Sequence, residues 1–182
     1  GRLVYMGYGF LLSPFVPIWW MGEEFNNPYE IVVRYPGDPM ANYFNNPFFI
    51  KMDWPSLNNN MAFFNQVKQL VQIRKTYKDI LAPFAGPLNG VNLAKVASNA
   101  GLQAYGMFNG NTAIVVAGTK DNGPSSLTLQ ISPSDLGLGS YKAFRVTNLM
   151  NGTAQTLTAA QIKAFTVPSG PYQLHVYKIT GQ

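Results

Sequence analysis

Hydrophobic and polar positions change their spacing along the 182 residues, and the change divides the chain into two regions near residue 82. The first region holds apolar stretches with helical spacing or with no alternation. The second alternates apolar and polar positions between clusters of Gly, Pro, Asn and Ser, as short antiparallel strands do. Pro83, Gly86, Pro87 and Gly90 fall between the regions and predict a linker.

The start of the first region predicts a helix followed by a buried strand. Leu3 to Leu12 is a short apolar helix candidate, and Ser13-Pro14 would end it, because a residue before proline disfavours the helical backbone. Residues 15–21 are apolar without alternation and end at Gly22. This pattern is typical of a parallel strand that is covered on both faces.

The rest of the first region predicts a long loop and a second helix. Residues 22–55 are rich in Asn and Pro and show little periodicity, so we interpret them as a loop with at most one turn of helix. Ser56 is a good N-cap, and apolar residues follow it at close to helical spacing over residues 57–77. Basic residues load the last turns, where they complement the helix C-terminus.

The second region predicts an antiparallel β-sandwich. Asn109-Gly110 separates two of its strands and is a strong hairpin signal, because both residue types accept positive φ angles. Regular strands at this spacing give a fold class of α+β, mainly β. The strand candidates are Ala94 to Ser98, Leu102 to Phe108, Thr112 to Gly118, Ser126 to Ile131, Tyr141 to Thr147, Ile162 to Val167 and Tyr172 to Ile179.

Composition and charge remove several classes of protein and of partner. With 47% hydrophobic, 14% aromatic and 12% charged residues, the chain has the composition of a globular domain. The absence of cysteine excludes a disulfide framework and a thiolate zinc site. The net charge of +5 comes from scattered basic residues, which argues against nucleic acid as a partner. Pro14 and Pro17 interrupt the longest apolar run, so we expect no membrane span.

The most informative segment reads Phe15-Val16-Pro17-Ile18-Trp19-Trp20-Met21-Gly22-Glu23-Glu24-Phe25. It resembles the end of the eighth barrel strand in the α-amylase clan of glycoside hydrolases, where a proline, apolar or aromatic residues and a Gly-Glu/Asp-Glu step are common. Asp53-Trp54 and the following helix, with Leu70, Ile73, Arg74 and Lys75, are similar to the last barrel helix of that clan. Residues 90–182 then look like its C-terminal sandwich, domain C.

The resemblance implies a division of the chain into two parts. Residues 1–81 would be the C-terminal end of an incomplete (β/α)8 barrel, with a strand at about 15–21, a long loop at 22–55 and a helix at about 57–77. Residues 82–182 would be the antiparallel domain C-like β-sandwich. One strand and one or two helices cannot close a barrel, because seven further parallel strands are needed to pair their backbones and fill the interior.

The sequence departs from the clan at the catalytic residues. The clan's nucleophile, acid/base and transition-state-stabilising aspartate lie on earlier barrel strands, the last of them after a His-Asp motif. The one histidine of this chain, His175, lies near its end and is not followed by an aspartate. We therefore expect no catalytic residue here and no hydrolytic activity of this chain alone.

Residues near the predicted strand are candidates for a substrate border. Glu23 and Glu24 are adjacent, so their side chains would diverge in an extended segment, which makes them poor candidates for the paired carboxylates of glycoside hydrolysis. The resemblance implies that they support the loop beside the active site. Aromatic rings and amides of the same region would suit stacking on sugars and hydrogen bonding to them, or equally core packing and turn formation. These further candidates are Trp19, Trp20, Asn26, Asn27, Tyr29 and Trp54.

Other polar residues favour structural interpretations. His175 fits a buried histidine with satisfied ring nitrogens, and serine nucleophile chemistry lacks a nearby histidine in the sequence. Asp121-Asn122-Gly123 predicts a loop tip with too few oxygen ligands for calcium. Asn151-Gly152-Thr153 fits a glycosylation acceptor by a pattern that is common by chance. The sequence shows no metal-ligand cluster and implies no cofactor.

The leading hypothesis is the C-terminal part of an α-amylase-like enzyme that acts on α-glucosidic bonds. Its partners would be an oligo- or polysaccharide, bound through the parent enzyme, and the rest of the barrel or another chain covering residues 1–81. The alternative is a non-catalytic carbohydrate-binding or structural β-sandwich module. An immunoglobulin-type peptide-binding sandwich would leave the Gly-Glu-Glu step unexplained. The sequence does not fix the compartment; a secreted or periplasmic location is compatible with it and is preferred.

Overall fold

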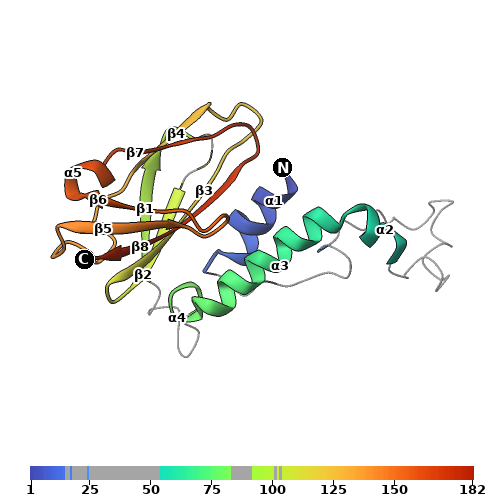
Figure 1. Cartoon of the computed structure of the whole chain (residues 1–182), viewed down its shortest axis with the longest axis horizontal. Coiled ribbons are helices and arrows are strands. Elements are labelled where there is room, and N and C mark those ends of the chain that lie inside the picture. Colours follow the sequence, from blue (N-terminus) through green and yellow to red (C-terminus); the bar gives the residue numbers. More distant parts are fainter. Residues whose placement is uncertain (15–16, 18–23, 25–53, 83–91, 101, 103) are drawn as a thin grey trace, which may run out of the picture. The chain divides into compact units, whose positions relative to one another are not determined.

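The computed structural model describes residues 1–14, 17, 24, 54–82, 92–100, 102 and 104–182. It is mainly β, with an eight-stranded antiparallel sheet, one long helix and a few short ones among the described residues (Figure 1). Its backbone contacts divide the chain into two compact units. One joins Gly1–Pro17 to Gln69–Gln182, and the other is Ile18–Lys68. The division expected near residue 82 stays a prediction, since residues 83–91, the expected linker, lie outside the described residues.

The sheet has the strand order β6-β5-β8-β3-β2-β1-β4-β7, and every neighbouring pair is antiparallel. Each strand candidate of the sequence overlaps an observed strand, while β6 was not predicted. The strands are β1 Leu93–Ser98, β2 Ala104–Asn109, β3 Thr112–Gly118, β4 Ser126–Gln130, β5 Ala143–Asn148, β6 Ala154–Thr158, β7 Phe165–Pro168 and β8 Leu174–Gly181.

The hairpin between β2 and β3 lies where Asn109-Gly110 predicted it, but one residue further along. Asn109 still belongs to β2 and pairs with Thr112, so the two turn residues are Gly110 and Asn111. Gly110 has a φ of 58°, and among the described non-glycine residues Asn111 is not one with a positive φ. A positive φ at the first turn position alone is the type II′ pattern, which requires glycine there.

The sheet curls around one hydrophobic core because β1 changes partners along its length. Its first residues, Leu93 to Val96, pair with β2, and its last, Ala97 and Ser98, pair with β4. The curl brings β7, at one edge, against β8, so that the rings of Phe165 and Tyr177 meet edge to face with centroids 5.0 Å apart. The buried residues of this inner core include Val96, Ala113, Val115, Ala117, Leu127, Leu129, Leu136, Phe144, Val146, Ile162 and Ile179.

The curled antiparallel sheet confirms the mainly β fold class, while a domain C-like sandwich stays an expectation. The candidate strand over residues 162–167 is only partly right, because its first residue ends helix α5, Ala159–Ile162. That helix begins with a capping box in which Thr158 and Gln161 bond each other's backbone N–H groups. In Figure 1, α5 lies on the side of the strands away from α1.

Helices of the same unit cover the outer face of the sheet at β2, β3 and β8. The N-terminal segment forms α1, Arg2–Val4, and the π-helix η1, Tyr5–Leu11, and α4 spans Lys78–Leu81. Gly7 of η1 approaches β8 so closely that a Cβ there would overlap the side chain of Leu174. A Cβ on Gly118 of β3 would likewise meet Val4 at 2.7 Å. The six residues from Ala113 to Gly118 are consequently buried on both faces of the strand.

The helix predictions hold with two corrections. The predicted helix Leu3 to Leu12 exists, but its main part is a π-helix, as in the 3.0 Å bond from the Leu12 N–H to the Gly7 carbonyl. The predicted helix over residues 57–77 is two helices, α2 Trp54–Asn59 and α3 Met61–Thr76. It starts before Ser56 because Pro55 is tolerated in a first helical turn. The strand predicted at residues 15–21 lies outside the described residues except for Pro17.

Candidate functional site

Two of the candidate substrate-border residues lie in the described part of the chain, and both belong to the Ile18–Lys68 unit. Glu24 is half-buried, and Trp54 opens α2 with 60% of its side chain exposed. The proposed roles of both residues stay predictions. The other candidates, Trp19, Trp20, Glu23, Asn26, Asn27 and Tyr29, lie outside the described residues.

Arg74 of α3 holds the described residues just before the predicted strand at 15–21. Its Nη1 atom donates hydrogen bonds to the carbonyl oxygens of Leu11 and, at 3.0 Å, of Ser13. Ser13 also donates its hydroxyl to the Phe10 carbonyl at 2.8 Å. The last carbonyls of a helix have no partners within it, and a cation there also complements the helix dipole. Arg74 therefore fixes the C-terminus of η1 just before residue 15.

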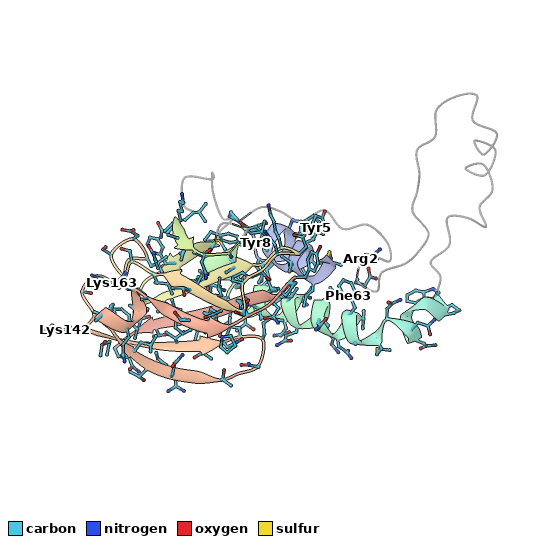
Figure 2. The ribbon with its side chains drawn as sticks, turned by 90° about the horizontal axis from the view of Figure 1, so that it is seen from above. Arg2, Tyr5, Tyr8, Phe63, Lys142 and Lys163 are labelled. Atoms are coloured by element: carbon cyan, nitrogen blue, oxygen red, sulfur yellow. The ribbon has the colours of Figure 1, made fainter. Side chains whose placement is uncertain are left out.

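Two tyrosines tie η1 to the sheet beside this arginine. The Tyr105 hydroxyl of β2 donates to the Tyr8 carbonyl, and the two rings pack with centroids 5.1 Å apart. Burial raises the pKa of Tyr105, and the neighbouring Arg74 only partly offsets this. Burial also raises the pKa of Tyr8 and lowers that of Arg74. Both phenols are therefore neutral donors at ordinary pH. Figure 2 shows Tyr5 and Tyr8 on the N-terminal helix, on the side of the sheet-containing unit away from Lys142 and Lys163.

A second polar cluster joins Ser169, His175 and Tyr177. The Nε2 atom of His175 lies 2.9 Å from the Ser169 hydroxyl, and its Nδ1 atom lies 3.4 Å from the Tyr177 hydroxyl. His175 is only 7% exposed, and burial lowers its pKa. Burial also raises the pKa of Tyr177 to about 12. The expectation of a satisfied structural histidine is confirmed, while the expectation that no serine lies near it is wrong.

The closeness of Ser169 and His175 was not predicted from the sequence, because it depends on how the loop between β7 and β8 folds back within the six positions that separate them. The pair has the nucleophile and base geometry of a serine hydrolase, but its third member is a neutral phenol rather than a carboxylate. A neutral tyrosine does not stabilise an imidazolium as an aspartate does. We therefore interpret the cluster as a satisfied network that orders the start of β8.

The carboxylates of the sheet-containing unit do not form an acid/base pair. Asp79, Asp121 and Asp135 lie on separate elements, and each is exposed. A carboxyl that serves as general acid in glycoside hydrolysis lies in an apolar setting, whereas these three carboxyls are exposed. Among the described residues, no cluster of potential metal ligands occurs, and no helix is long and apolar enough to cross a membrane.

Comparison with known proteins gives a likeness in fold. No family model matches the chain, and no curated protein matches it in sequence. The whole chain superposes on part of a noncanonic maltogenic alpha-amylase from Thermotoga neapolitana, with a TM-score of 0.58 and 12% identity. A second match, at a TM-score of 0.41 and 14% identity over 74% of the chain, is a protein of Bacillus halodurans C-125 provisionally named an alpha-N-acetylgalactosaminidase, of which the chain covers 26%.

The first match is a likeness between the backbone fold of this chain and that of one part of a larger protein. The chain spans 37% of the length of the Thermotoga neapolitana amylase. At 12% identity, the likeness is one of fold. The second match is too weak in TM-score to add to it. The chain thus shares its fold with a segment of a glycoside hydrolase.

Proposed function

We propose that the chain is the C-terminal part of an α-amylase-like glycoside hydrolase. In this proposal, residues 1–81 contribute the last strand and helix of the catalytic barrel, and the curled sheet is the domain C-like sandwich. The parent enzyme cleaves α-glucosidic bonds, or transfers the α-glucosyl group to another acceptor, by a retaining two-carboxylate mechanism. The catalytic carboxylates are supplied by the rest of the barrel, so residues 1–182 alone are inactive.

The observation that carries the proposal is the order of elements together with the fold likeness over the whole chain. A helix leads to the apolar segment with Gly22-Glu23-Glu24, a long helix follows, and an antiparallel sheet completes the chain. The resemblance of the motif and the fold likeness to a maltogenic alpha-amylase both support the proposal. A sandwich module without a barrel would not need the Gly-Glu-Glu segment between its helices.

The contacts of Arg74 support a positioning role for the start of the chain. By holding the carbonyls of Leu11 and Ser13, Arg74 fixes the backbone two residues before the predicted strand at 15–21. In a barrel, the loop that follows a strand borders the active site. An anchored entry to the strand would set where Glu23 and Glu24 lie at its other end. These two carboxylates then support the loop, and they take no direct part in bond cleavage.

An activity assay tests the proposal on both the chain and its parent. The 182 residues should not release reducing sugar from maltohexaose, whereas the complete gene product should do so with the α-anomer formed first, as followed by proton NMR. Robust turnover by the 182 residues alone contradicts the proposal. A complete product that binds maltohexaose without cleaving it would favour the alternative, a carbohydrate-binding module.

A substitution at Glu24 separates support from catalysis within the active parent. Replacing a nucleophile or an acid/base typically lowers kcat by roughly 10⁴-fold or more, as triad deletions do. We expect Glu24→Gln to lower kcat/KM by about tenfold or less, because a glutamine keeps most of the hydrogen bonds of a supporting carboxylate. A loss of catalytic size would place Glu24 in the reaction itself.

A further inference from the structure

Strand β6 forms one of the two edges of the sheet, and part of its backbone faces away from its only neighbour, β5. Where the two strands meet, the Asn148 N–H of β5 donates to the Thr153 carbonyl at 2.8 Å. Along an antiparallel pair, the backbone groups of successive residues point alternately toward the partner strand and away from it. Ala154 and Thr156 therefore direct their N–H and C=O groups away from β5, and no described residue bonds to these groups.

This open edge is short because helix α5 closes its far end. Thr158 is the next residue of β6 whose N–H points away from β5, and this N–H donates to the Gln161 Oε1 atom at 2.9 Å in the capping box. Residues 154–156 are all exposed. The edge between the β5–β6 turn and α5 therefore has room to pair with one short extended segment.

The two edges of the sheet differ in how they are protected. The other edge strand, β7, ends at Pro168, which has no N–H to donate, and its Phe165 ring packs on Tyr177 of β8. Natural sheets commonly block an exposed edge with proline or with charged side chains on the edge strand. Strand β6 contains neither a proline nor a charged residue. Such an edge can accept a further strand through backbone hydrogen bonds.

Three exposed basic residues surround the β6 edge. Arg145 of β5 lies directly opposite Thr156 in the strand register. Lys142 accepts the N–H of Ala159, the first residue of α5, and Lys163 caps the other end of that helix. Figure 2 shows both lysines at the same end of the sheet-containing unit. No described carboxylate lies on β5, β6 or α5, so the charge around this edge is positive only.

We propose that β6 binds an extended acidic segment of a partner protein, which adds to the sheet as a further strand. The added strand would lie about 10 Å from β5, a distance that an arginine and a glutamate side chain span together. Acidic side chains on it would therefore meet Arg145 across Thr156. A second copy of this chain is disfavoured, because pairing of two β6 strands would bring like charges together. The inference goes beyond the proposed hydrolase and does not depend on it.

Fluorescence anisotropy with a labelled peptide that alternates Glu and Val tests the proposal on the 182-residue chain. This peptide should bind saturably, and added salt should weaken its binding, since exposed charges are screened. A peptide that alternates Lys and Val should bind at least tenfold more weakly. The Glu and Val peptide with every amide N-methylated keeps its charge but loses its N–H donors, so it should also bind at least tenfold more weakly.

Variants of the chain separate backbone pairing from charge. Thr156→Pro removes an N–H that faces away from β5, so it should leave the β5–β6 ladder intact and weaken binding by tenfold or more. Arg145→Gln should weaken binding by about three- to tenfold. Lys95→Gln is the matched control, because it removes a charge from an exposed position on β1, and it should stay within about twofold. Circular dichroism checks that each variant is folded.

Four outcomes would overturn the proposal. The first is the absence of binding between the Glu and Val peptide and the wild type. The second is equal affinity for the N-methylated peptide, a test that needs no change in the protein and therefore holds even if Thr156→Pro does not fold. The third is wild-type affinity in folded Thr156→Pro. The fourth is a dimer in analytical ultracentrifugation that Thr156→Pro dissociates, which would assign the β6 edge to a second copy of this chain.

Discussion

Strand β3 gives a sharp test of the layer of helices on the outer face of the sheet. Val115 points into the core that the sheet encloses, and Val116 points to the opposite face, where η1 and α4 pack. Both side chains are 0% exposed. If the helices cover the outer face in solution, the two valines should matter about equally, although they are neighbours in sequence.

The expected magnitude follows from the atoms removed. Valine to alanine deletes two buried carbons, worth about 1.6 kcal/mol at ~0.8 kcal/mol each, and the cavity left behind adds to this. We therefore expect Val115→Ala and Val116→Ala each to lower the free energy of unfolding by about 2–3 kcal/mol. Thr156→Ala, on the exposed strand β6, is the control and should change it by about 0.5 kcal/mol or less.

Urea unfolding followed by circular dichroism measures all three variants. The slope of the transition should be unchanged, so that a shift in midpoint reports stability. The refuting result is a cost near 2 kcal/mol for Val115→Ala with a cost under about 0.5 kcal/mol for Val116→Ala. That outcome would mean that the outer face is open to water and that the helices do not cover it.

Three further predictions concern single residues. Burial lowers the folded-state pKa of His175 below its unfolded value of about 6.5. The contribution of neutral His175 to the free energy of unfolding should therefore be complete above that pH and be lost on acidification, with a slope of up to about 1.4 kcal/mol per pH unit. His175→Gln should lose this part of the slope in urea unfolding between pH 6.5 and 5. Gln69 donates to two carbonyls of the β5–β6 turn at 3.0 and 2.9 Å, so Gln69→Leu should cost about 1–3 kcal/mol, and an unchanged urea midpoint would count against these bonds. Gly7→Ala should destabilise the protein by about 1–3 kcal/mol through overlap with Leu174, whereas Gly9→Ala, with nothing within 4 Å, should stabilise it by about 0.5–1 kcal/mol, and equal Tm values for the two would refute the close packing of η1 on β8.

Local signals predicted most of the strands and helices because each depends on nearby residues. The alternation of apolar and polar positions located the strands, and Asn109-Gly110 located the hairpin to within one residue. Strand β6 escaped because its residues are largely exposed and form no alternating pattern. The strand candidate at 162–167 was too long, since Thr158 and Gln161 supply a capping box that starts a helix.

Features that depend on distant partners could not be derived from local pattern. The uninterrupted apolar run from Ala113 to Ala117 was the signal that β3 is covered on both faces, but the sequence does not say which helices cover it. The approach of Ser169 to His175 depends on the path of the loop between them. The curl of the sheet depends on β1 pairing first with β2 and then with β4. The residues of β1 by themselves do not indicate these two partners.

For the candidate site, the resemblance and the residue types indicated a set of candidate residues, and two of them lie among the described residues. Glu24 and Trp54 are placed, while the tryptophans and amides of the segment before residue 30 are known from sequence only. The anchor formed by Arg74 has no motif that would mark it. It follows from long-range contacts, with partners 63 and 61 residues away.

In the proposed enzyme, this chain completes a barrel whose catalytic strands precede it, and sequencing the gene upstream of the codon for Gly1 tests this arrangement. We expect about 250 preceding residues in the same reading frame, the usual length of such a barrel, with a His-Asp motif on a late strand. A start codon close to Gly1, with no barrel encoded before it, would refute the proposal.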